Sequence, residues 1–364
     1  MTTDSQLRKP LVDNLPPNGS APENGQQDPS PGSRKKRRSR HTLTDIARAF
    51  RENEKVTSVI GSSFRALQRA GISVTPNHFY WPVPDLAELE RRPWPDPSAL
   101  VGVDLRLPEQ LRFLQDIVPR YSSELMFSNA PNLDSEYHYN NGYFESVDAE
   151  IAYCFVRHYR PSRIIEVGGG MSTRLLATAL KMNRDQDQVQ GELITIDPFP
   201  DPRLGRHWGD LRRLIAKPVQ DVGLELFLTL QAGDMLFLDS SHVVSVGSDV
   251  VREYLEILPR LNRGVLVHAH DIFLPDEYPR DSVLKLLSFW SEQYLMQAFL
   301  AFNSAFEVLW GSSAMQAYHA DELGLAFPNW KESHIRMPKN LRSQIPTRDN
   351  RRVWPSSFWI RRTQ

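Results

Sequence analysis

Short runs of apolar residues in the second half of the chain each end at an acidic residue. The clearest is Arg163-Ile164-Ile165-Glu166-Val167, which leads into three consecutive glycines, Gly168 to Gly170. An apolar run of this length, bounded by glycine, is typical of a strand buried in a parallel sheet. The same reasoning predicts strands at 163–167, 193–196, 215–219, 235–238 and 265–270.

Apolar residues at helical spacing occupy the gaps between these strands. Ser172 or Thr173 can cap the first such helix, because a side-chain oxygen there accepts from the first unpaired amides. Strand and helix alternate through residue 301, and this order predicts a doubly wound, Rossmann-like α/β domain. The other elements expected are helices at 109–117, 151–158, 172–182, 248–258 and 281–301 and strands at 305–310 and 357–361.

Four acids stand at the ends of the predicted strands: Glu166, Asp197, Asp239 and Asp271. The carboxyl ends of parallel strands meet at one edge of a sheet, and ligands bind at that edge in open α/β folds. Each acid alone could simply open a loop or cap a helix. The four together favour a binding edge.

The position of Glu166 narrows the kind of ligand. A dinucleotide fold uses G-x-G-x-x-G to hold a pyrophosphate, whereas this loop reads E-V-G-G-G-M-S. A carboxylate directly before the glycines would repel a pyrophosphate and favour a cationic amino group. The glycines would let the backbone approach such a ligand closely.

Several motifs together resemble one enzyme family. They are Asn141-Gly142-Tyr143-Phe144, Asp148-Ala149-Glu150, Glu166 to Gly170 with Ser172-Thr173, Asp239-Ser240-Ser241-His242, and His270-Asp271-Ile272-Phe273. In this combination the chain resembles class I S-adenosylmethionine-dependent methyltransferases, in the bacterial group that contains macrolide-sugar O-methyltransferases. The resemblance covers roughly residues 140 to 310. It implies a seven-stranded sheet with an antiparallel close, and S-adenosylmethionine as cofactor.

The resemblance also implies roles for individual residues toward the cofactor. Asp197 would accept the ribose hydroxyls, with Asp201 a weaker candidate, because a carboxylate accepts two hydroxyl donors well. Gln220 and Asp221 would meet the adenine, or would simply cap the next helix. The remaining cofactor residues implied are Glu166, Gly168, Gly169, Gly170, Ser172, Thr173 and Asp239.

Asp239, His242 and Asp271 bear on catalysis. Methylating a hydroxyl requires removal of its proton, and a histidine has a suitable pKa for that. In the related enzymes a D-x-S-H segment supplies a metal-binding carboxylate and a histidine base, which Asp239 and His242 match here. Asp239 and Asp271 could hold Mg²⁺, but His270 stands where the relatives have an acid. The sequence therefore leaves magnesium, a metal that prefers imidazole, and no metal as alternatives.

The amino-terminal segment has another composition. Residues 1–41 hold eight basic and four acidic side chains, net +4, which leaves −5 for the rest of a chain whose total is −1. We expect 1–41 to be a disordered, proline-rich basic tail. Its basic run, Arg34 to His41, could bind nucleic acid or acidic lipid or act as a nuclear signal, but it could also be a solubilising tail. The mildly acidic remainder argues against nucleic acid at the catalytic face.

The region between tail and catalytic domain is predicted to be a helical and extended cap, residues 42–140, ahead of the S-adenosylmethionine-binding domain at 141–364. Amphipathic helices are expected at 43–50 and 59–67, followed by a proline-rich stretch. Such an addition would act as a lid or as the contact surface of a homo-oligomer.

The composition sets the remaining expectations. Cys154 is the single cysteine, so no intrachain disulfide is possible, and no apolar stretch approaches the roughly 20 residues of a membrane span. The polar start predicts no secretory signal and a cytoplasmic location. We expect an O-methyltransferase for a small-molecule hydroxyl. The alternatives are a metal-dependent hydroxylase on the same fold and a catalytically silent fold that binds a partner through its basic tail.

Overall fold

The computed structural model describes residues 54–75, 77, 81–129, 137–201, 212–332 and 355–364. The chain divides into two units, residues 1–76 and 77–364. The predicted basic tail and the first amphipathic helix lie outside the described residues. No described helix is long and apolar enough to cross a bilayer.

The first unit contains helix α2, Glu54–Arg69, which includes the second predicted amphipathic segment. Gly71 follows it with a positive φ of 78°, and Ile72 donates its amide to the Leu67 carbonyl at 2.9 Å. Glycine favours this left-handed conformation because it has no Cβ, so it is the usual residue just after a helix.

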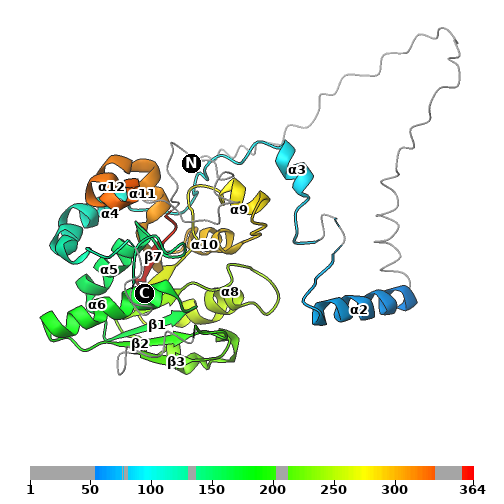
Figure 1. Ribbon diagram of the computed structural model, residues 1–364, viewed down its shortest axis with the longest axis horizontal. Coiled ribbons are helices and arrows are strands. Elements are labelled where there is room, and N and C mark those ends of the chain that lie inside the picture. The colour runs from blue at the N-terminus through cyan, green and yellow to red at the C-terminus, as the bar shows by residue number, and fades with distance from the viewer. Residues whose placement is uncertain (1–53, 76, 78–80, 130–136, 202–211, 333–354) are drawn as a thin grey trace, which may run out of the picture. The chain divides into compact units, whose positions relative to one another are not determined.

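The second unit is built on a seven-stranded sheet in the order β3-β2-β1-β4-β5-β7-β6 (Figure 1). The first five strands are parallel, and β7 runs antiparallel to both β5 and β6. This arrangement confirms the predicted doubly wound α/β fold and its antiparallel close. The strands are β1 Arg163–Val167, β2 Glu192–Ile196, β3 Arg212–Ile215, β4 Met235–Leu238, β5 Leu266–Ala269, β6 Phe306–Gly311 and β7 Phe358–Arg362.

Helices cover both faces of the sheet, and alternate strand residues contact different faces. On β1, Ile164 joins the core that contains α5 and α6, whereas Ile165 and Val167 join the core on the other face with Tyr254. The helices are α3 Leu86–Arg91, α4 Leu107–Arg112, α5 Asp148–Tyr159, α6 Met171–Asp187, α7 Leu224–Phe227, α8 Asp249–Arg252, α9 Arg280–Leu284, α10 Glu292–Leu300, α11 Ser312–Tyr318, α12 Ala320–Ala326 and α13 Pro328–Glu332.

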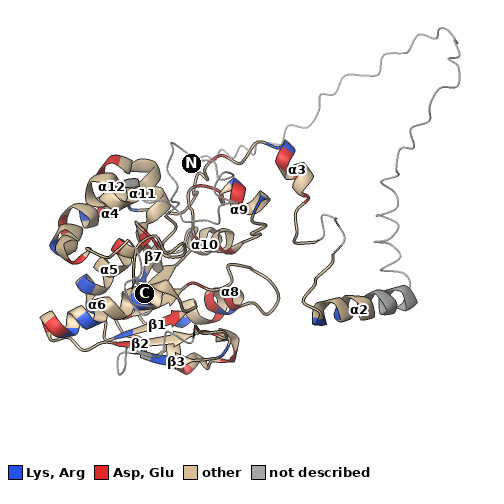
Figure 2. Cartoon of the chain, viewed as in Figure 1, with Lys and Arg blue, Asp and Glu red and all other residues tan. Residues whose placement is uncertain are grey.

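Short 3₁₀ and π turns follow or connect some of these helices. They are η1 Phe113–Ile117, η2 Val118–Glu124, η5 Val219–Asp221, η6 Glu253–Ile257 and η7 Leu258–Arg260. Basic and acidic residues both occur on α6, and β2 and β3 carry charged residues at their starts (Figure 2).

Two predicted elements were wrong in extent. The third strand was expected at 215–219 but ends at Ile215, because Pro218 precedes the short turn η5 and has no amide to donate to a ladder. The long helix expected at 281–301 is two helices, α9 and α10, separated by irregular backbone in which Leu287 has a positive φ of 59°. The amides of Ser291 and Glu292 donate to the His242 carbonyl instead of continuing one helix.

Candidate active site

The glycine loop joins β1 to α6 at the carboxyl edge of the sheet. Gly168 has a φ of 86°, and a Cβ built on it would lie 1.8 Å from the backbone oxygen of Asp239. Its amide donates to the Ile196 carbonyl at 2.9 Å. Gly168 is therefore required by the close contact with the end of β4. Gly170 differs, since a Cβ there would meet no atom within 4 Å.

Glu166 lies beneath this loop, fully buried on the face toward α6. Its two carboxylate oxygens accept hydrogen bonds from the hydroxyls of Ser172, Thr173 and Thr195 at 2.7 to 2.9 Å. Burial raises the pKa of Glu166 to about 7, although these hydroxyls oppose the shift. The side chain orders the start of α6, and its direct contact with a ligand stays a prediction.

Asp197, at the end of β2, holds the loop from the other side. Its carboxylate accepts from the amide of Gly169 at 2.9 Å and from that of Phe199 at 2.7 Å. Asp201, the weaker candidate for the same role, pairs with Arg174 at 3.5 Å. Asp197 is thus the acid that contacts the glycine loop.

Gln220 and Asp221 belong to the turn η5 and are exposed. Gln220 donates its side-chain amide to the Gly247 carbonyl at 3.1 Å. Neither residue has a described contact with the glycine loop, so their role toward an adenine ring stays a prediction.

Two acids and two histidines meet where β4 and β5 end. His242 Nε2 lies 3.5 Å from Asp239 Oδ1 and 3.4 Å from Asp271 Oδ2. His270 Nδ1 lies 3.5 Å from Asp239 Oδ1 and 3.8 Å from Asp271 Oδ1. The three residues predicted to act in catalysis are therefore brought together, and His270 joins them.

A fifth residue, Glu292 at the start of α10, fixes His242. Its carboxylate lies 2.9 Å from His242 Nδ1 and accepts from the Tyr254 hydroxyl at 2.9 Å. His242 also has a positive φ of 60°, a conformation uncommon outside glycine. Both constraints turn Nε2 toward Asp239 and Asp271.

The charge of His242 follows from these contacts. Burial disfavours the imidazolium, but the hydrogen bonds of Asp239 and Glu292 and the charge of Asp271 outweigh it and raise the pKa of His242 well above its usual value. In this arrangement His242 carries a proton that it must lose before it can act as a base.

His270 is held in a similar way by Asp148, the first residue of α5. Burial again opposes the imidazolium, yet Asp271, Asp239 and Asp148 raise the pKa of His270 well above its usual value. Asp148 accepts from the amides of Ser356 and Ser357 at 2.8 and 2.9 Å. An acidic residue that begins α5 thus ties the cluster to the start of β7.

The sequence analysis named Asp148 only as part of a family motif, and it gave Glu292 no role. The available signal for Glu292 was the polar pair Glu292-Gln293 inside an apolar helical pattern. Both carboxylates are almost completely buried, which marks them as partners of other buried groups.

The expected magnesium site at Asp239 and Asp271 stays a prediction. Both carboxylates face His242 and His270, whereas Mg²⁺ prefers oxygen ligands. Within the described ranges no three His, Cys, Asp or Glu side chains are arranged to hold a metal ion. No metal-dependent step is derived from this geometry.

The solved structures similar to this chain are remote in sequence. An S-adenosylhomocysteine-bound methyltransferase from Podospora anserina is 17% identical, with 53% of this chain and 82% of that chain covered and a TM-score of 0.34. An O-methyltransferase from Bacillus cereus in complex with S-adenosylhomocysteine is 13% identical, with 56% and 89% covered and a TM-score of 0.31.

Sequence comparison is more informative. Residues 165–272, from β1 through the residue after Asp271, match the model of a methyltransferase domain. An uncharacterised protein of Archaeoglobus fulgidus is 35% identical over 188 residues, which cover 49% of this chain and 83% of the archaeal protein. The chain has the seven-stranded sheet of class I methyltransferases, matches a methyltransferase domain over residues 165–272, and therefore belongs to the family of that archaeal protein.

Proposed function

We propose that this methyltransferase transfers a methyl group from S-adenosylmethionine to a hydroxyl of a small molecule, with His242 as the proton acceptor. The observation that carries the proposal is the fixed orientation of His242, whose Nε2 faces Asp239 and Asp271 at the carboxyl edge of the sheet. The motif resemblance to macrolide-sugar O-methyltransferases supports oxygen as the methyl acceptor.

The glycine loop fits the cofactor. Asp197 holds the loop through the Gly169 amide, and Glu166 holds the start of the helix that follows the loop. Gly168 packs against the end of β4, whereas the space beside Gly170 is open. Glu166 is buried with a raised pKa, so an ammonium group nearby would stabilise its charged form. These features support the amino-acid end of the cofactor at this loop.

When bound, S-adenosylmethionine supplies a methyl group on a positively charged sulfur. A hydroxyl oxygen of the acceptor forms the new bond to the methyl carbon as the carbon–sulfur bond breaks, and its proton passes to Nε2 of His242. His242 must be neutral to accept that proton. The positive charge of the cofactor would lower the pKa of His242 and help to release its first proton.

Calorimetric titration with S-adenosylhomocysteine tests the cofactor site. We expect micromolar binding by the wild type and at least tenfold weaker binding by Asp197→Asn and Gly170→Ala. Asp185→Asn is the matched control, because Asp185 is exposed on α6 and pairs with Lys181. No binding by the wild type would contradict the proposal.

A second experiment tests the base. Transfer of a labelled methyl group to a panel of hydroxyl-bearing small molecules identifies an acceptor, and His242→Asn should then reduce kcat by 10²-fold or more. His158→Asn, a change on α5 outside the acid–histidine cluster, should leave kcat unchanged. An unaltered kcat in His242→Asn would remove the histidine base.

A further inference from the structure

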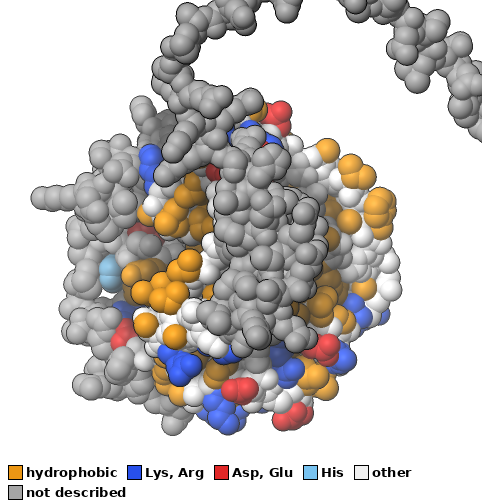
Figure 3. Space-filling model, turned by 90° about the vertical axis from the view of Figure 1, so that its right-hand side faces the viewer, with side chains coloured by type: hydrophobic (Ala, Val, Ile, Leu, Met, Phe, Trp, Pro, Cys, Tyr) orange, Lys and Arg blue, Asp and Glu red, His pale blue; other side chains and the backbone are white. Residues whose placement is uncertain are grey.

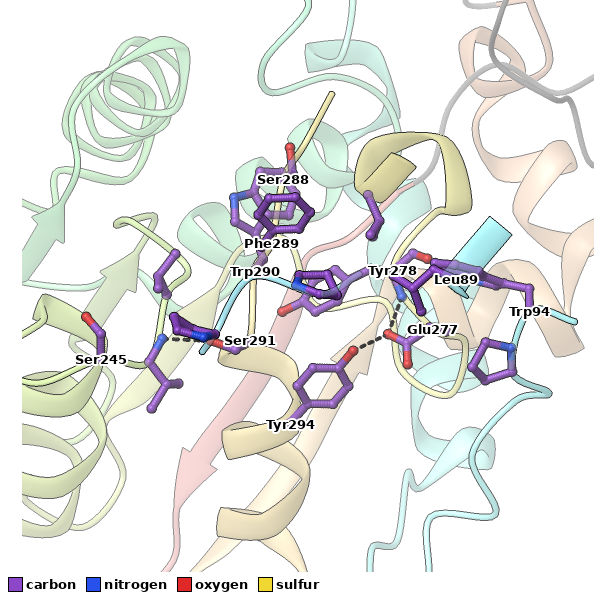
Figure 4. A pocket seen from close by; sticks show the side chains of 16 residues that line it. Leu89, Trp94, Ser245, Glu277, Tyr278, Ser288, Phe289, Trp290, Ser291 and Tyr294 are labelled. Carbon is purple, nitrogen blue, oxygen red and sulfur yellow. Dashed lines mark hydrogen bonds between the residues drawn. The ribbon is translucent and has the colours of Figure 1, made fainter. Parts of the chain in front are cut away.

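A cavity of about 430 Å³ adjoins His242 and takes no part in the proposed cofactor site. One wall is the segment Val243 to Ser245, which directly follows His242. Another wall is Trp290, whose ring centroid lies 5.1 Å from that of His242. The Val244 amide donates to the Ser291 hydroxyl at 2.8 Å and joins the two walls (Figure 4). A molecule in this cavity would therefore lie beside the proposed base.

The cavity has a largely aromatic lining. Figure 4 shows Trp94, Tyr278, Phe289, Trp290 and Tyr294 around the space. The indole of Trp94 donates to the Tyr278 carbonyl at 3.0 Å, so a segment far ahead in the sequence closes one side. The face of the molecule viewed in Figure 3 carries several groups of hydrophobic side chains. A cavity of this size and character suits a ring-bearing organic molecule.

Glu277 is the one charged residue among the described residues that line the cavity. Its Oε1 accepts hydrogen bonds from the Tyr278 amide, the Gln293 side chain and the Tyr294 hydroxyl, at 2.7, 3.2 and 2.6 Å. No described residue donates a hydrogen bond to Oε2. The three bonds fix the carboxylate and leave one oxygen for a ligand.

Arg280, the basic residue closest to Glu277 in the sequence, is not a described partner of this carboxylate. The Arg280 guanidinium lies 5.8 Å from the centre of the Trp94 ring and donates to the Glu90 carbonyl. Arg280 forms no described ion pair with Glu277 and does not line the cavity. A fixed carboxylate among aromatic rings is instead suited to an ammonium group, which gains from both charge pairing and ring faces.

We propose that the cavity holds the methyl acceptor and that this acceptor carries a protonated amine on an apolar, ring-bearing body. The amine lies at Glu277 Oε2 among the rings of Tyr278, Trp290 and Tyr294, and the hydroxyl to be methylated points toward His242. This inference rests on the proposed function for its link to methylation, but the binding preference itself does not need turnover.

The test compares two small probes that differ in one amine. Tyramine and 4-ethylphenol share a phenol and a two-carbon chain, and only tyramine is cationic at pH 7. We expect tyramine to bind the full-length protein at least tenfold more tightly than 4-ethylphenol in ligand-observed NMR titrations. In Glu277→Gln the two probes should bind with about equal affinity. The glutamine amide oxygen can still accept the three fixed hydrogen bonds, so the side chain should keep its position.

Two further variants separate charge from folding. Glu256→Gln removes an exposed carboxylate that pairs with Arg260 and should keep the full preference. Trp290→Leu should weaken the binding of both probes but keep part of the difference between their affinities. Equal affinity for the two probes, an unchanged preference in Glu277→Gln, or no binding of either probe at millimolar concentration would overturn the inference. Failure of S-adenosylhomocysteine to bind would overturn the proposed function and leave this result as it stands.

Discussion

Glu166 and Asp239 lie near the carboxyl ends of the neighbouring parallel strands β1 and β4, yet their surroundings shift their pKa values in opposite directions. Glu166 lies at the end of β1 among three hydroxyls, and burial raises its pKa to about 7. Asp239 follows β4 between two histidines, and although burial opposes its charge, His270 and His242 lower its pKa well below the usual range. Partners from other elements, rather than strand position, decide the charge of each acid.

The carboxyl edge of the sheet therefore contains two kinds of site. The Glu166 side favours an added positive charge, because its carboxylate has no cationic partner among its hydrogen-bond donors. On the Asp239 side, the carboxylates of Asp148, Asp239, Asp271 and Glu292 already surround the imidazoles of His242 and His270 and raise the pKa values of both histidines. Four substitutions test this difference, and the substitution with the greatest expected effect is described first.

Gly168→Ala should have the largest effect. The added Cβ would overlap the Asp239 carbonyl, so the loop or the end of β4 must move, and we expect more than about 3 kcal/mol of lost stability. Gly170→Ala is the matched change in open space and should melt within a few degrees of the wild type. Thermal unfolding of both variants checks this, and equal melting temperatures would refute the close contact.

Glu292→Gln should alter the titration of His242. The wild-type pKa of His242 is raised partly by the Glu292 carboxylate, so a neutral amide should lower that pKa. NMR titration of the histidine ring protons, assigned with His242→Asn, measures the shift. In the enzyme the variant should reach its full rate at lower pH, because the neutral base is then available sooner. A pKa that rises or stays constant would contradict the contact.

Glu166→Gln should change how stability depends on pH. The folded-state pKa of Glu166 is about 7 against a usual 4.5, so the native state binds more protons between these values and the wild type loses stability as pH rises through this window. The glutamine variant should lack this loss, a difference on the order of 3 kcal/mol at pH 8. Melting curves from pH 4 to 8 measure it, with Glu256→Gln as the exposed control. Parallel curves would show that the Glu166 pKa is not raised.

Asp221→Asn should have the smallest effect. Asp221 is exposed and its turn is held by backbone hydrogen bonds, so folding should not change. Any contact with the adenine ring should appear only as a reduction in S-adenosylhomocysteine affinity of less than about tenfold. Calorimetry on this variant and on Asp197→Asn compares the loss of S-adenosylhomocysteine affinity at the two acids. An equal loss would show that Asp221 contributes more to binding than its exposed position suggests.

The sequence predicted the sheet well because its signal is local. An apolar run that ends in an acid and glycines marks β1 and its loop without knowledge of distant residues. The same holds for Asp239, His242 and Asp271, which directly follow β4 and β5. The error at β3 was also local, since Lys217 and Pro218 were assigned to a strand that ends before them.

The partners of these residues could not be predicted in the same way. Glu292 reaches His242 from 50 residues away and Asp148 meets Ser356 across 208 residues, so only the folded chain brings them together. The break between α9 and α10 has the same origin, because the His242 carbonyl accepts the amides that a continuous helix would use internally. Pairings of this kind leave little trace in a single sequence beyond a buried polar residue.

The start of α10 has a consequence for how this enzyme could change its substrate. Trp290 forms a wall of the aromatic cavity, and two residues later Glu292 sets the proton affinity of His242. Because one short stretch of backbone carries both, a mutation that moves this stretch to reshape the cavity should also shift the pKa of His242, the proposed base. The proposed acceptor site and the pH dependence of the reaction would then change together.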